Sequence, residues 1–171
     1  MVLLQGEIML KPAILYKEAL AEKAKVVLSN PEKYQFMELC NYLCYDTFVI
    51  DDVSEWAKIK RVSINGENEV LGFMKAAVCR QDNSVSELLF VNFNLHKLSI
   101  TFVRDMEIFL QYLLKMFRKV SFVCVVGNPA ERLYDKVIEK YHGRVVGIKK
   151  QEALLQDGQL YDLKLYEIVK E

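Results

Sequence analysis

Proline, glycine and histidine are scarce in this chain of 171 residues, which holds three, seven and two of them, respectively. With so few prolines and glycines, the sequence contains no flexible linker and no low-complexity tract that would divide it into domains. The two histidines leave few nitrogen ligands for a transition metal. We therefore expect one domain over residues 1–171, without a metal site.

Neither sign of charge is in excess, because 23 basic and 23 acidic residues cancel. This balance gives no electrostatic reason to expect a nucleic-acid or anionic-membrane partner. No apolar stretch approaches the roughly 20 residues of a transmembrane helix. The first ten residues, MVLLQGEIML, carry Gln5 and Glu7 too early for a typical signal peptide. These absences predict a cytoplasmic protein.

The four cysteines are scattered, and only Cys40 and Cys44 lie close together, one helical turn apart. No second cysteine or histidine pair follows at the spacing of zinc ligands. The pair is open to two interpretations, a metal or disulfide role and a role as reduced, mostly buried thiols, and the spacing favours the second.

Apolar side chains are abundant, at 52% of residues, with nine Phe and nine Tyr. This content is ample for a folded core and argues against disorder. In the first half, residues 6–12 read as a short strand. Tyr16, Leu20, Ala24 and Val27 recur at helical spacing. Asn30 and Pro31 read as the start of a second helix, whose apolar face is formed by Phe36, Leu39, Cys40 and Leu43.

After residue 58 the apolar period changes to two. Segments 58–64 and 69–81 flank Asn65-Gly66, which is a strong hairpin signal, and a strand over 85–93 follows. A long helix then carries one apolar face, formed by Val103, Met106, Leu110, Leu113, Leu114 and Phe117.

The continuous apolar run 120–126 predicts a strand buried on both faces. A helix begins at Asn128-Pro129. Strands 144–155 and 159–169 flank a second hairpin signal, Asp157-Gly158. The order is β-α-α-β-β-β-α-β-α-β-β. It predicts an α/β (α+β) domain with a mixed, mostly antiparallel sheet of six to seven strands, about four helices and one βαβ crossover.

Four segments from residue 70 onward follow one another in a distinctive order: VLGFMKAAV (70–78), SELLFVNF (86–93), NPAERLYDKVIEKYHGRVVG (128–147) and DGQLYDLKLYEI (157–168). In order and spacing they resemble the Gcn5-related N-acetyltransferase (GNAT) superfamily. The third resembles the family's N-x-x-A-x-x-L-Y-x-K-x-G-F stretch. The last resembles the closing hairpin of members related to ribosomal-protein N-terminal acetyltransferases. The resemblance implies a GNAT fold and acetyl-CoA as the donor substrate.

In this family the fourth and fifth strands part, and the pantetheine arm of acetyl-CoA lies between them. It bonds to the backbone of the fourth strand, here at Val91, Asn92 and Phe93. The pyrophosphate binds amides at the start of the next helix, a turn marked by Q/R-x-x-G-x-G/A. This sequence has NLHKLSITFVRDM (94–106) there, with Thr101 and Val103 at the glycine positions. Both residues are β-branched and ill suited to positive φ.

Two interpretations of this departure remain. The loop binds CoA with fewer amides, helped by the side chains of Lys97, Ser99, Thr101 and Arg104, or CoA binding has been lost. His96 lies in the same loop, where it would contact a phosphate or face solvent. The other histidine, His142, reads as a turn residue before Gly143.

The resemblance also assigns catalytic roles. Tyr134 falls on the family's tyrosine that protonates the leaving thiolate; alternatively, it is a core aromatic. Glu87 resembles the family's strand glutamate that takes the proton of the amine; alternatively, it faces solvent. Asn128 resembles an asparagine near the cofactor, but Asn128 with Glu131 also reads as an ordinary helix start. Backbone amides at Val91 or Asn92 are the candidate donors to the thioester carbonyl.

The acceptor is expected to be an amine, of a small molecule or of a protein. Trp56 with Asp51, Asp52 and Glu55 would form an acidic rim that attracts a cation, or a solvated loop. The alternative to an enzyme is a non-catalytic GNAT-like module that binds another ligand or a protein. Either a monomer or a homodimer is compatible with the sequence, since the strand 159–169 could pair with a second copy or belong to the sheet.

Overall fold

A computed structural model describes residues 10–36, 47–50, 54–94, 98–155 and 157–170. Its centre is one seven-stranded sheet, in the order β1-β2-β3-β4-β5-β7-β6. The strands are β1 (Leu10–Pro12), β2 (Lys58–Ile64), β3 (Val70–Cys79), β4 (Ser84–Asn92), β5 (Lys119–Val125), β6 (Arg144–Leu154) and β7 (Leu160–Val169). All pairs are antiparallel except β4 with β5. The predicted fold class, hairpins and βαβ crossover are confirmed.

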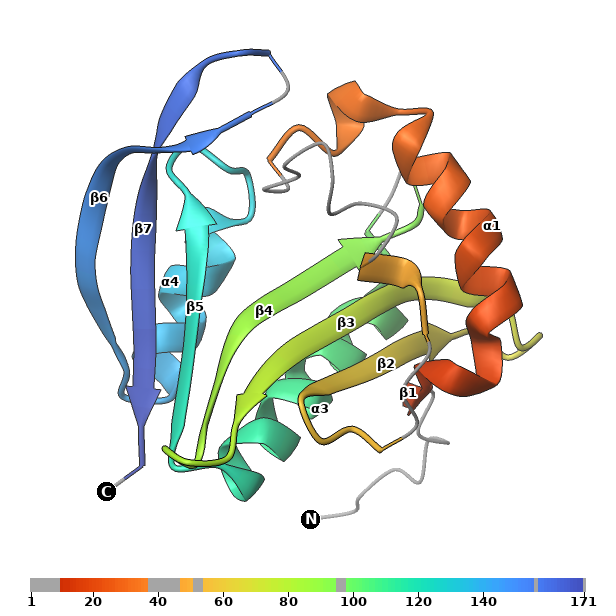
Figure 1. Ribbon diagram of the computed structural model, residues 1–171, viewed down its shortest axis with the longest axis horizontal. Coiled ribbons are helices and arrows are strands. Elements are labelled where there is room, and N and C mark those ends of the chain that lie inside the picture. Colours follow the sequence, from red (N-terminus) through yellow and green to blue (C-terminus); the bar gives the residue numbers. More distant parts are fainter. Residues whose placement is uncertain (1–9, 37–46, 51–53, 95–97, 156, 171) are drawn as a thin grey trace.

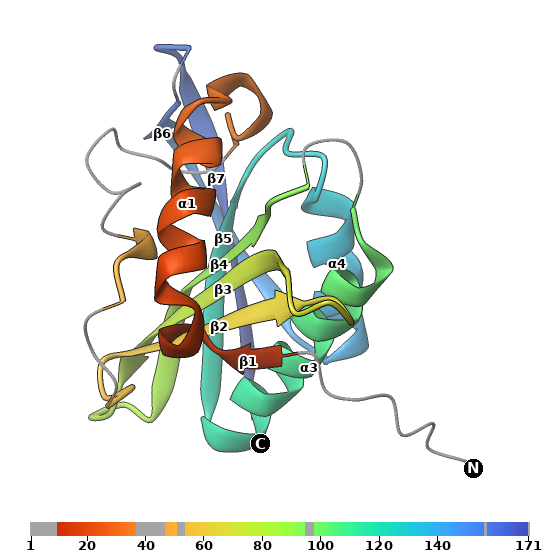
Figure 2. The ribbon, with the colours of Figure 1, turned by 90° about the vertical axis from the view of Figure 1, so that its right-hand side faces the viewer.

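Helices cover the sheet on both faces. The described α-helices are α1 (Lys17–Leu28), α3 (Ile100–Met116) and α4 (Glu131–Lys140). Figure 2 shows α1 on one side of the sheet and α3 and α4 on the other. Two buried clusters match these layers: one lies under α3 and α4, around Phe109, Phe122 and Tyr166, and the other lies under α1, around Leu20 and Phe73. No helix of the described residues is long and apolar enough to span a membrane.

The predicted β2–β3 hairpin forms, but its turn is not a two-residue turn centred on Gly66. The loop runs over residues 65–69, and the positive φ of 66° falls on Asn68. The side chain of Asn65 accepts hydrogen bonds from the amides of Glu67 and Glu69, at 3.0 and 2.8 Å. Asparagine tolerates the left-handed conformation and bonds to its own turn, so it takes the place of glycine here.

The helix predicted after Asn30-Pro31 is replaced, in its described part, by a 3₁₀ turn over Pro31–Lys33. The amide of Asn30 does not cap that turn, because it donates backwards to the carbonyl of Val26 at 2.8 Å. Three of the residues predicted for its apolar face, Leu39, Cys40 and Leu43, lie outside the described residues, as do Cys44, Asp51 and Asp52. The count of about four helices is therefore too high by one for the described chain.

One prediction about the C-terminal strands is wrong, and one alternative that the sequence left open is resolved. β5 is not buried on both faces, because the side chain of Val123 is 38% exposed. The described helices on the α1 side cover β2 to β4 and leave β5 open (Figure 1). β7 is bonded on both sides, to β5 and to β6. Its backbone is therefore used within the sheet, and β6 is the edge strand.

Candidate functional site

The two parallel strands in the middle of the sheet part after only two residue pairs. β4 and β5 are paired at Ser84 with Lys119 and at Val85 with Val120, and at no later described position. Glu87 has a φ of 50°, and two β4 residues, Glu87 and Leu88, oppose Ala76 of β3. Such a bulge bends a strand and increases its twist. In Figure 1 the strands meet at their lower ends and diverge upward, so the later described residues of β4 face the opening instead of pairing with β5.

The direction of the β4 amides selects between Val91 and Asn92, the two candidate donors to the thioester carbonyl. The amide of Phe93 donates to the carbonyl of Leu71 in β3, at 3.0 Å. Amides of alternate residues point to the same side of a strand, so that of Val91 also points at β3. Those of Phe90 and Asn92 point at the opening. The hydroxyl of Tyr34 donates to the carbonyl of Asn92 at 3.0 Å, which agrees with this direction. Asn92 is therefore the better placed of the two candidates.

Helix α3 begins at the upper end of the same opening. Ser99 is its N-cap, and the hydroxyl of Ser99 accepts a bond from the amide of Phe102 at 3.5 Å. Ile100 and Thr101 follow as the first two helical residues, and their amides point along the helix axis without intrahelical partners. Thr101 and Val103 both lie in helical backbone, not at positive φ. Their β-branched side chains are therefore unstrained here.

Gly72 positions this helix start against the sheet. A Cβ atom at residue 72 would overlap the ring of Phe102, in the first turn of α3, and would lie 2.7 Å from the carbonyl oxygen of Val91. The glycine of the 70–78 segment thus has a packing role. It brings the free amides of α3 close to the end of β4.

Tyr134 lies in the first turns of α4 and faces the sheet. Its ring packs edge-on against Phe122 of β5, with centroids 5.6 Å apart, and lies 6.4 Å from Tyr166. Burial, with a smaller contribution from Cys124, raises the pKa of Tyr134 to about 12. Within the described chain, no group hydrogen-bonds to its hydroxyl. Tyr134 is therefore a protonated donor held in place by its ring alone.

Glu87 is not in contact with Tyr134. Its carboxylate is 67% exposed and pairs with Lys75, Oε2 to Nζ, at 3.7 Å. Lys75 alternates along β3 with Met74 and Ala76, which belong to the cluster under α3 and α4. Since strand side chains alternate, Lys75 and Glu87 lie on the α1 face. Tyr134 belongs to α4, on the other face of the sheet. Glu87 and Tyr134 therefore lie on opposite sides of the opening.

Most of the remaining predicted site residues that the structure describes already have partners within the protein. The side chain of Phe93 packs against Phe48, with ring centroids 5.8 Å apart, and its amide is used by β3. Arg104 is exposed and lies 3.8 Å from Asp105. Asn128 accepts from the amide of Ala130 at 2.8 Å and so caps the turn before α4. Lys97 and His96 lie outside the described residues.

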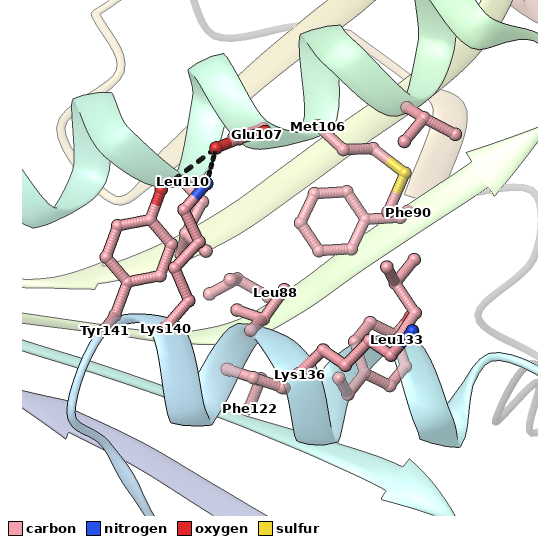
Figure 3. Close-up of a pocket in the computed structure, with 13 residues that line it drawn as sticks. Leu88, Phe90, Met106, Glu107, Leu110, Phe122, Leu133, Lys136, Lys140 and Tyr141 are labelled. Atoms are coloured by element: carbon pink, nitrogen blue, oxygen red, sulfur yellow. Dashed lines mark hydrogen bonds and ion pairs between the residues drawn. The ribbon is translucent and has the colours of Figure 1, made fainter.

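An apolar pocket of about 230 Å³ lies between α3 and α4 (Figure 3). Tyr134 and Leu133 line it near the start of α4, and Leu88 and Phe90 form part of its floor. At the far end Glu107 of α3 accepts from Lys140 and, at 3.5 Å, from Tyr141. We call this group of three residues the latch. It joins the two helices across the pocket.

The sequence carries no signal for this pocket. Met106 and Leu110 lie on the predicted apolar face of α3, but their spacing cannot separate a pocket wall from a core. The latch gives no signal, because its partners are 33 and 34 residues apart. Among the described residues, no group of three or more His, Cys, Asp or Glu side chains could hold a metal ion.

No protein-family model matches the chain, and no curated protein is significantly similar to it in sequence. Solved structures do match. One is a probable GNAT-family acetyltransferase from Chromobacterium violaceum ATCC 12472, with a TM-score of 0.69 and 14% identity, over 94% of this chain and 86% of that one. Another is an acetyltransferase from Salmonella typhimurium that modifies the N-terminal serine of ribosomal protein L7/L12, with a TM-score of 0.70 and 14% identity, over 95% and 94%.

A third match is a spermidine N-acetyltransferase from Vibrio cholerae in complex with CoA and spermine, with a TM-score of 0.67 and 13% identity, over 94% of both chains. At these identities the likeness concerns the fold. It agrees with the seven-stranded sheet, its crossover and the parting of β4 and β5. This chain has the fold of the GNAT acetyltransferases, as its sequence predicted.

Proposed function

We propose that this protein is an N-acetyltransferase that transfers the acetyl group of acetyl-CoA to an amine. The observation that carries the proposal is the opening between β4 and β5, beside which Tyr134 lines a pocket together with Phe90 of β4 and Phe122 of β5. The fold alone would not suffice, because one fold supports many functions.

The donor fits the opening in three places. The pyrophosphate would bind the amides of Ile100 and Thr101, where the helix dipole favours negative charge. Glycines are not needed for this, since those amides belong to a regular helix. The pantetheine amides would pair with the β4 edge at Phe90, as an added strand would, and the amide of Asn92 is kept for the thioester carbonyl. The sulfur would then lie at Tyr134.

The transfer needs two proton movements. Glu87 would take the proton of the ammonium group, directly or through a water, so that a neutral amine attacks the thioester carbon. The carbon–nitrogen bond forms, the nitrogen loses its second proton to solvent, and the carbon–sulfur bond breaks. The amide of Asn92 would stabilise the carbonyl oxygen. Tyr134 donates a hydrogen bond to the departing thiolate. A pKa of about 12 keeps that donor protonated at neutral pH.

A panel of amines tests this proposal: polyamines, amino acids, and peptides with free N-termini or lysines, with thiol release measured at millimolar acetyl-CoA. Thiol release that depends on one class of amine supports it and identifies the acceptor. Acetyl-CoA binding without thiol release from any amine contradicts it.

The second candidate is a non-catalytic module that binds an apolar partner. It is favoured by Leu98 and Ile100, which stand at the start of α3 with exposed apolar side chains, Ile100 being 86% exposed. Binding without thiol release is the result that selects this candidate.

A further inference from the structure

We propose that the pocket between α3 and α4 holds the acyl chain of the donor, and that the protein binds medium-chain acyl-CoA more tightly than acetyl-CoA. This inference rests on the proposed function, because it places the thioester at Tyr134. Medium-chain acyl-CoA is a class of donor that acetyl transfer does not require. An acetyl group ends two carbons beyond the sulfur, and most of the pocket then has no occupant.

The pocket continues the proposed site in one direction. Its wall runs along α4 from Tyr134 through Val137 to Tyr141, and along α3 from Val103 to Leu110. The seven-residue step on each helix corresponds to roughly 10 Å. In Figure 3 the two helices run side by side, with the latch at one end and Leu133 at the other. The end at Leu133 and Tyr134 is at the start of α4, which follows the end of β5, where β4 and β5 are farthest apart.

The chemistry of the wall suits an alkyl chain better than pantetheine. Its lining is mainly carbon, from Leu88, Phe90 and Met106 among others. The polar groups of the latch are paired with one another, and Lys136 is exposed at the rim. Pantetheine has two amide groups, which would lose hydrogen bonds to water in such a pocket. An alkyl chain has none to lose.

The latch sets the length of the chain. With carbon–carbon bonds of ~1.5 Å at tetrahedral angles, an extended chain advances roughly 1.25 Å per carbon, so roughly 10 Å holds about eight carbons. Each buried methylene improves binding about fourfold, since it contributes about 0.8 kcal/mol. Affinity should therefore rise from acetyl to about octanoyl and then stop, because longer chains meet Glu107, Lys140 and Tyr141.

The test is a calorimetric series of dissociation constants for CoA and for acetyl-, butanoyl-, hexanoyl-, octanoyl- and dodecanoyl-CoA, without an amine. We expect a rise of at least 100-fold from acetyl to octanoyl and none beyond. Equal affinities for CoA and all acyl-CoAs would overturn the inference and leave the proposed function standing. No binding of any of them would overturn both.

A variant locates the chain. Val137→Phe narrows the far half of the pocket at a half-buried position, so octanoyl-CoA affinity should fall at least tenfold more than acetyl-CoA affinity. Val145→Phe, on the exposed face of edge strand β6, is the matched control and should leave the ratio of the two affinities as in the parent. Equal losses for both donors in Val137→Phe would place the chain elsewhere. Circular dichroism confirms that each variant is folded.

Discussion

Replacing Tyr134 by Phe should separate catalysis from stability. The substitution removes one oxygen atom and keeps the ring, whose contacts with Phe122 and Tyr166 hold the side chain in place. Because nothing in the described chain bonds to the hydroxyl, its removal leaves no buried group unpaired. We expect the free energy of unfolding to change by less than about 0.5 kcal/mol.

The expected loss of rate follows from the pKa of Tyr134. A hydroxyl with a pKa of about 12 cannot readily give its whole proton to a thiolate of pKa about 8.5. It acts as a hydrogen-bond donor to the developing charge, and removal of one such donor lowers kcat about 100- to 1,000-fold. The lower end is expected, because a thiolate is a good leaving group. The donor stays protonated to high pH, so ionisation of Tyr134 should not limit the rate below about pH 10.

The assay is steady-state thiol release with the best amine of the panel, combined with calorimetry for CoA. Tyr166→Phe is the matched control. It removes the bond from the Tyr166 hydroxyl to Asp135, 2.9 Å long, so it should cost about 1 kcal/mol of stability, a modest value because Asp135 is half exposed. Its kcat should fall less than fivefold. A Tyr134→Phe enzyme that keeps its kcat within threefold of the parent would refute the assignment of Tyr134 as donor.

Three further predictions concern the start of α3 and the core beneath it. Ile100→Pro removes the first helical amide but suits the helix start, since Ser99 has the extended φ and ψ of −71° and 133° that precede proline. The affinity for CoA, measured by calorimetry, should fall about tenfold or more. Ile100→Ala, which retains the amide, should keep the affinity of the parent. Gly72→Ala should cost about 1–3 kcal/mol of stability through overlap with α3, and Gly66→Ala, with open space around it, should cost under about 0.5 kcal/mol in a urea titration. Burial raises the pKa of Asp105, so this residue favours folding below its unfolded pKa and loses that contribution as pH rises through its folded pKa. Between pH 4 and pH 8 the Tm of Asp105→Asn should therefore rise relative to the Tm of the parent. A difference in Tm that does not change with pH would contradict this.

The sequence predicted the sheet well because its signals are local. The Asn65-Gly66 and Asp157-Gly158 turns and the alternation around them define two hairpins, and both are present. The bulge at Glu87 was beyond the sequence, because no turn residue marks it. It nevertheless bends β4 away from β5 and so creates the opening. The positive φ at Glu87 is a consequence of tertiary structure, not of local propensity.

The site was predicted in part for the same reason. Tyr134 became a candidate because it lies in a helical phrase that resembles the family's. Ser99 was expected to contact CoA, and its place as the N-cap of α3 was not predicted. The missing glycines do not decide whether CoA binds. Thr101 looks unsuitable only if the phosphate turn needs positive φ, and in the structure it lies in helical backbone. The latch joins Glu107 to residues more than thirty positions away, and only folding brings them together.

The central claim is that acetyl-CoA binds in the opening between β4 and β5. Thermal unfolding with and without millimolar acetyl-CoA tests it most directly. At 100 times its dissociation constant, the donor should add about 2.7 kcal/mol of stability. For a chain of this length that amounts to a rise in Tm of roughly 5–10 °C. The rise should be much smaller in Ile100→Pro than in the parent. An unchanged Tm of the parent at millimolar acetyl-CoA would contradict the account.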